Sequence, residues 1–156
     1  MTDAVVIGVG NAYRRDDGVG PAVAAMVEAL ELPGVRVLRC AAETTAILDA
    51  GEGARLAVVV DAANGPEPGR VRRCDLDDLA DEQPVSSHEL SLQQTYALAR
   101  ALGRAPGSVV VVTVDVADTG HGVGLSPPVA AALSAAVRVV RSVVGEPVEE
   151  PGHQQP

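Results

Sequence analysis

Residues 4–20 read AVVIGVGNAYRRDDGVG, an apolar run followed by a glycine-rich turn and two adjacent aspartates. The run Ala4–Ile7 has the length and composition of a buried strand, and glycines after such a run are typical of a tight turn into a helix. This unit predicts the first strand of a sheet that is covered by helices. Because a turn of this kind often binds the phosphate of a nucleotide, the two aspartates require an explanation.

Apolar runs and helical patterns alternate along the rest of the chain. Residues 69–74 alternate between polar and apolar side chains and fit an edge strand or a hairpin arm. Helices between strands imply right-handed crossovers, so we expect an α/β fold, a three-layer α/β/α sandwich around a mostly parallel sheet of about five strands. The expected strands lie at residues 4–8, 35–38, 56–60 and 109–114, and the expected helices at 21–30, 44–50, 89–102 and 127–144.

Composition limits what the protein can do. The 156 residues predict one domain over residues 1–145, and the proline-rich segment 146–156 is predicted to be a disordered tail. All basic residues are arginines, so chemistry that needs a P-loop or Schiff-base lysine is excluded. A net charge of −9 disfavours nucleic acids and anionic membranes as partners. Two isolated cysteines and the lack of a signal peptide predict a cytoplasmic protein.

Polar residues follow two of the expected strands, at the edge where parallel sheets bind ligands. Asp16 and Asp17 close the loop after the first strand, and Asp61 follows the apolar run 56–60. Each aspartate alone has an ordinary explanation as a helix cap or a loop residue. Which of the two adjacent aspartates would act as a ligand stays open at this point.

A histidine is expected at the same edge. Ser86 and Glu89 have the spacing of a capping box, which places His88 in the first turn of the helix expected over residues 89–102. The helix dipole would then keep the imidazole of His88 neutral and able to bind a metal. Together with the carboxylates of Asp17 and Asp61, it predicts a metal site with oxygen and nitrogen ligands.

Other kinds of site fit the sequence less well. The dinucleotide fingerprint fails because Tyr13 stands where its third glycine is required, and a receiver domain would need a lysine. The G-x-S-x-G elbow and the HExxH motif are both absent from the sequence. His121, in a glycine-rich stretch, is a weaker candidate ligand than His88, and His153 in the tail is weaker still.

Four motifs together resemble those of the hydrogenase maturation proteases, over about residues 4–144. They are GVGN at 8–11 with DDGVG at 16–20, VVVDA at 58–62, SSH at 86–88 and GLSP at 124–127. The resemblance implies an endopeptidase that removes a C-terminal extension from the large-subunit precursor of a nickel-iron hydrogenase after nickel insertion. It also implies that the precursor carries the nickel and that Asp17, Asp61 and His88 contact it. No nucleotide is expected.

The resemblance leaves the mechanism and one alternative open. Nickel could activate the peptide bond or a water, or Asp17 and Asp61 could be the catalytic pair, with one carboxylate acting as general base. Residues 40–44 read CAAET, where many members have a D-G-G-T-like turn, and Glu89 follows His88 where many have Gly or Gln. The alternative function is a non-catalytic α/β module that binds a metal or a protein.

Overall fold

Valine-rich runs form the centre of a five-stranded sheet with the strand order β2-β1-β3-β5-β4. The structure is a computed structural model and describes residues 4–79 and 91–145. Strands β1, β2, β3 and β5 are parallel, whereas β4 runs antiparallel to β5 at one edge. The strands are β1 (Ala4–Val9), β2 (Val35–Cys40), β3 (Leu56–Ala63), β4 (Val71–Asp75) and β5 (Ser108–Asp115). All the strands expected from the sequence are present.

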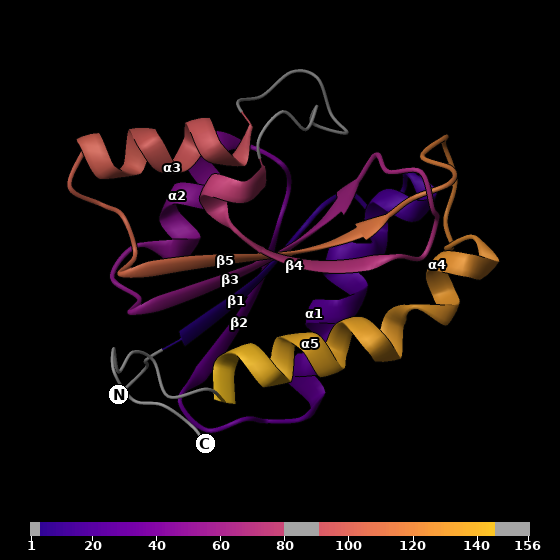
Figure 1. Cartoon of the computed structure of the whole chain (residues 1–156), viewed down its shortest axis with the longest axis horizontal. Helices are drawn as coiled ribbons and strands as arrows, with labels where there is room; N and C mark the ends of the chain where they lie inside the picture. Colours follow the sequence, from indigo (N-terminus) through magenta and orange to yellow (C-terminus); the bar gives the residue numbers. More distant parts are fainter. Residues whose placement is uncertain (1–3, 80–90, 146–156) are drawn as a thin grey trace.

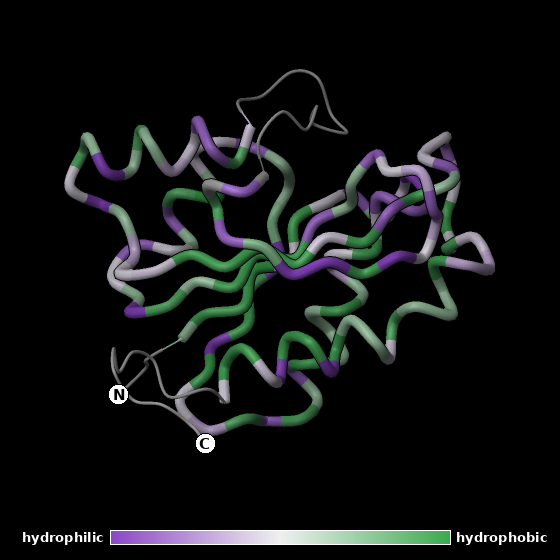
Figure 2. Tube along the Cα trace, viewed as in Figure 1, coloured by the Kyte–Doolittle hydropathy of each residue, from purple (hydrophilic) through white to green (hydrophobic). Residues whose placement is uncertain are grey.

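Helices cover both faces of this sheet (Figure 1). One face packs against α1 (Val19–Ala29), α4 (Pro127–Ala131) and α5 (Leu133–Gly145), and the other packs against α2 (Thr44–Gly51) and α3 (Leu92–Ala101). Successive strand residues alternate between two apolar clusters, because side chains on a strand point to opposite faces. The apolar colour in Figure 2 is accordingly concentrated on the central strands. The predicted α/β/α sandwich is confirmed.

Two helix predictions differ from the structure. The helix expected over 127–144 is divided into α4 and α5 at Ala132, and both parts place buried side chains on the same apolar cluster. The helix expected from Glu89 begins instead at Leu92, where Ser91 and Gln94 form the capping box. The Ser91 hydroxyl accepts a hydrogen bond from Gln94 N at 3.1 Å, and Gln94 Oε1 accepts one from Ser91 N at 3.0 Å.

Some predictions fall on residues 80–90 and 146–156, which lie outside the described part of the chain. These predictions concern Ser86, His88, Glu89, His153 and the tail. Within the described ranges, no helix has the length and apolar character needed to cross a membrane.

Candidate active site

Glycines allow the loop after β1 to pack tightly against the start of α1. A Cβ atom on Gly10, which has a φ of +151°, would overlap the carbonyl oxygen of Asp17. A Cβ atom on Gly20 would overlap the carbonyl oxygen of Val9 and lie 2.6 Å from that of Val60. The glycines therefore serve close backbone packing, and they bring Asp17 to the carboxyl edge of the sheet.

Asp17 is buried at this edge, with 5% of its surface exposed. Its Oδ2 atom accepts a hydrogen bond from Asn11 N at 3.1 Å and lies 3.9 Å from the guanidinium of Arg14. Burial raises the pKa of Asp17 above its ordinary value, although the Asn11 hydrogen bond and the charge of Arg14 oppose the shift. The loop thus holds the carboxylate in one orientation.

Asp61 lies within β3, and not after the strand as the sequence suggested. Its neighbour Val60 is the last residue of β3 that pairs with β1, while Asp61 still pairs with Thr113 of β5. The carboxylate is therefore held by regular strand backbone, one residue beyond the last pair between β1 and β3. The longer pairing with β5, which local composition does not reveal, explains the difference.

The carboxylates of Asp17 and Asp61 are electrostatically coupled. Burial and the charge of Asp17 raise the pKa of Asp61 to about 7, although a hydrogen bond of 2.9 Å from Ala62 N to its Oδ1 atom opposes the shift. Each carboxylate therefore has one oxygen bonded to the backbone. The second oxygen of each accepts no hydrogen bond from the described residues. The pair can thus bind a cation or exchange a proton near neutral pH.

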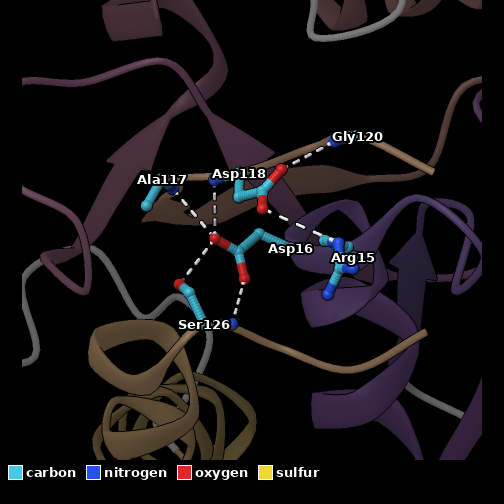
Figure 3. A network of polar contacts seen from close by, with 6 residues as sticks. All are labelled: Arg15, Asp16, Ala117, Asp118, Gly120 and Ser126. Carbon is cyan, nitrogen blue, oxygen red and sulfur yellow. Dashed lines mark hydrogen bonds and ion pairs between the residues drawn. The ribbon is translucent and has the colours of Figure 1, made fainter. Parts of the chain in front are cut away.

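Asp16 has a different role from its neighbour, because its carboxylate faces the segment 117–126 (Figure 3). Its Oδ2 atom accepts hydrogen bonds from Ala117 N at 2.9 Å, Asp118 N at 3.0 Å and the Ser126 hydroxyl at 2.7 Å. Its Oδ1 atom accepts one from Ser126 N at 2.6 Å. Burial favours the neutral acid, but these hydrogen bonds outweigh it and hold the pKa of Asp16 below its ordinary value. Asp16 therefore anchors the loop that carries Asp17.

His88 lies outside the described residues, so its predicted place beside the two aspartates is not tested. α3 itself begins at Leu92 and is capped by Ser91, so the helix start that this prediction assumed is not the observed one. The helix-dipole argument for a neutral His88 rested on that start, and the protonation state of His88 stays a prediction. Over residues 4–79 and 91–145, no three His, Cys, Asp or Glu side chains are grouped closely enough to hold a metal ion.

Sequence reasoning missed two further groups near the ends of strands. Cys40 ends β2 in register with Val9, and burial together with the charges of Asp61 and Glu43 raises the pKa of its thiol to about 11. The thiol is therefore protonated at neutral pH. The sequence could have indicated Cys40, because this residue ends an expected parallel strand at the edge where such sheets bind ligands.

The second missed group is Asp115, a fully buried carboxylate at the end of β5. Its Oδ1 atom lies 3.1 Å from Arg72 Nη2, so it forms an ion pair with β4. Its position at the end of a valine-rich strand resembles that of Asp61. Its hydrogen bond from an arginine distinguishes it from Asp17 and Asp61, which accept hydrogen bonds only from backbone N–H groups of the described residues.

Residues 22–143 match the sequence model of a family described as hydrogenase maturation protease. The chain belongs to this family. It is therefore a hydrogenase maturation endopeptidase, an enzyme that hydrolyses peptide bonds, and the predicted family and enzyme class are confirmed. No curated protein matches the chain significantly.

Solved structures of hydrogenase maturation endopeptidases have the same fold as this chain. HybD from E. coli has a TM-score of 0.76 and 23% identity, with 92% of each chain covered. The hydrogenase 2 maturation peptidase from Thaumarchaeota archaeon SCGC_AB-539-E09 has a TM-score of 0.68 and 26% identity, covering 92% of this chain and 99% of its own. HycI from Thermococcus kodakarensis has a TM-score of 0.65 and 27% identity, covering 91% and 90%.

Proposed function

We propose that this endopeptidase removes the C-terminal extension of a nickel-iron hydrogenase large-subunit precursor after nickel has been inserted. The proposal rests on one observation: the buried carboxylates of Asp17 and Asp61 are electrostatically coupled at the carboxyl edge of the sheet. In a family of hydrogenase maturation proteases, the natural substrate is a hydrogenase precursor, and a buried acidic pair is complementary to a metal cation that such a precursor carries.

Asp17, Asp61 and His88 are the proposed contacts to the nickel of the precursor. Nickel accepts carboxylate oxygens and imidazole nitrogens as ligands, and each aspartate has an oxygen without a hydrogen bond from the described residues. The metal belongs to the substrate in this proposal, so the two aspartates and the histidine would distinguish loaded precursor from unloaded precursor. Bound nickel would also polarise the carbonyl of a nearby peptide bond.

Asp61 is the proposed general base of the hydrolysis. In the metal-free site the pKa of Asp61 is about 7, and nickel would lower it. The oxygen of Asp61 that does not contact the cation would take a proton from an attacking water and return it to the leaving amide nitrogen. A carboxylate has two oxygens with two lone pairs each, so Asp61 can contact a cation and still accept a proton. The negative charge of Asp17 increases the proton affinity of Asp61, as in other paired carboxylates.

The decisive experiment is to incubate the enzyme with nickel-loaded and nickel-free precursor and to weigh the products. We expect the wild-type enzyme to release a C-terminal peptide only from the loaded precursor. Asp17→Asn and Asp61→Asn should each slow the release by about a hundredfold or more. Asp118→Asn, which changes an exposed aspartate on a neighbouring loop, is the matched control and should retain the wild-type rate.

Each possible failure has a separate meaning. No peptide release by the wild-type enzyme from the cognate loaded precursor would refute the proposed function. Equal release from nickel-free precursor would refute nickel recognition but not proteolysis. Normal release by either asparagine variant would refute the role of that aspartate.

A further inference from the structure

Two loops that are distant in sequence meet next to Asp17. Arg15 N donates a hydrogen bond of 3.0 Å to the carbonyl oxygen of Gly122, and Gly122 N donates one of 2.9 Å to that of Tyr13. These bonds form a short parallel bridge between Arg14 and Gly122. The hydrogen bonds of Asp16 hold the same two segments together (Figure 3). The relative position of the loops is therefore fixed before any substrate binds.

The two loops carry the most exposed large apolar side chains of the described residues. Tyr13 is 73% exposed and Val123 is 70% exposed, whereas the other exposed large apolar side chains lie on or at the ends of helices and reach at most 54%. The chain has only two tyrosines and lacks phenylalanine and tryptophan, so an aromatic ring in water is unusual here. Such side chains on rigid backbone lose little entropy when a partner covers them.

Arg14 connects this exposed pair to the candidate active site. Its backbone is part of the bridge with Gly122, and its guanidinium lies 3.9 Å from the carboxylate of Asp17. That distance is too long for a hydrogen bond, and the guanidinium donates none to the described residues. Its N–H groups can therefore donate to the carbonyl oxygens of an extended polypeptide near the catalytic carboxylates.

We propose that Tyr13, Arg14 and Val123 form a docking surface for the segment of the precursor polypeptide that flanks the cleaved bond. This inference rests on the proposed function and names a part of the enzyme that selects its substrate. Apolar side chains next to a donor-rich guanidinium suit a polypeptide, which offers both side chains and carbonyl oxygens. The net charge of −9 makes a nucleic acid an unsuitable occupant.

The test measures binding of the precursor to variants that cannot cleave it. In an Asp17→Asn background, Tyr13→Ser and Val123→Ser should each raise the Kd for the precursor, by about tenfold or more for Tyr13→Ser. The factor by which each substitution raises the Kd should be the same for nickel-loaded and nickel-free precursor, because the surface contacts the polypeptide and not the metal. In the cleaving enzyme, Tyr13→Ser should raise KM and leave kcat unchanged.

Leu30→Ser is the matched control, because Leu30 is also an exposed apolar residue, 42% exposed, but lies at the opposite end of α1 from Asp17. It should leave Kd and KM unchanged. All these side chains are exposed, so unchanged thermal unfolding should accompany each substitution.

Three results would overturn the inference. Unchanged Kd and KM for Tyr13→Ser and Val123→Ser, with an active wild-type enzyme, would refute the docking surface and leave the proposed function intact. Light scattering that shows a dimer disrupted by Tyr13→Ser would assign the surface to a second copy of the chain. Failure of the wild-type enzyme to cleave would refute the proposed function, and the precursor as occupant with it.

Discussion

Removing the Asp16 carboxylate should destabilise the protein through the hydrogen bonds in Figure 3. Four donors from Ala117, Asp118 and Ser126 converge on this fully buried group. A hydrogen bond to a charged group contributes about 1.5–3 kcal/mol, but Ala117 and Asp118 are exposed, so water can replace part of the loss at their N–H groups. We expect Asp16→Ala to lower the free energy of unfolding by about 4 kcal/mol.

Asp16→Asn should lower the free energy of unfolding less than Asp16→Ala does, because one side-chain oxygen remains. The amide oxygen can occupy the Oδ2 position and keep three of the four hydrogen bonds. The NH2 group would then face Ser126 N, which donates to Oδ1 at 2.6 Å, so two donors would oppose each other. We expect this single mismatch to lower the free energy of unfolding by about 2 kcal/mol.

Urea denaturation of the two Asp16 variants tests this reasoning. Asp118→Asn is the control from the same network. Because Asp118 is exposed and lies 3.7 Å from Arg15, this substitution should lower the free energy of unfolding by less than about 1 kcal/mol. Because hydrogen bonds hold the pKa of Asp16 below its ordinary value, the native state binds fewer protons than the unfolded state. The contribution of the ionised Asp16 carboxylate to the free energy of unfolding should be complete at pH 7 and decline below about pH 4. An Asp16→Ala variant no less stable than Asp118→Asn would refute the account.

Two further predictions concern Asp61 and the glycines. Burial and the charge of Asp17 raise the pKa of Asp61 from 3.8 to about 7, so between these pH values the native state binds more protons than the unfolded state. Protonation of Asp61 therefore stabilises the native state at low pH, and this stabilisation is lost as the pH rises to about 7. In metal-free buffer, the free energy of unfolding of Asp61→Asn relative to that of the wild type should therefore rise by about 4 kcal/mol between pH 4 and pH 8. Urea denaturation measures this difference, and parallel pH profiles of the two proteins would contradict the prediction. Gly10→Ala should cost at least about 2 kcal/mol more than Gly53→Ala, since both glycines have positive φ but only Gly10 would meet another atom. Equal thermal unfolding of these two variants would exclude the overlap.

The strands were predictable because their signal is local. Runs such as residues 109–114 are almost entirely valine, and such a run is typical of a strand that is buried on both faces. The helix boundaries were less predictable. Ser86 with Glu89 and Ser91 with Gln94 both have the spacing of a capping box, and the structure uses the second pair. The break between α4 and α5 at Ala132 has no signal in local composition, because alanine is a strong helix former.

The sequence by itself determined the fold class, the family and the edge of the sheet at which acidic residues gather. The order of strands and helices sets the fold class and the edge, and it is encoded in local composition and periodicity. The family is indicated by four short motifs in the sequence. Only the tertiary structure separated the roles of Asp16 and Asp17, which are adjacent and chemically identical. A short 3-10 turn, Arg15–Gly18, directs the first carboxylate to Ser126 and leaves the second coupled to Asp61. Partners that are more than 40 residues away in sequence decide the difference, and no local pattern contains that information.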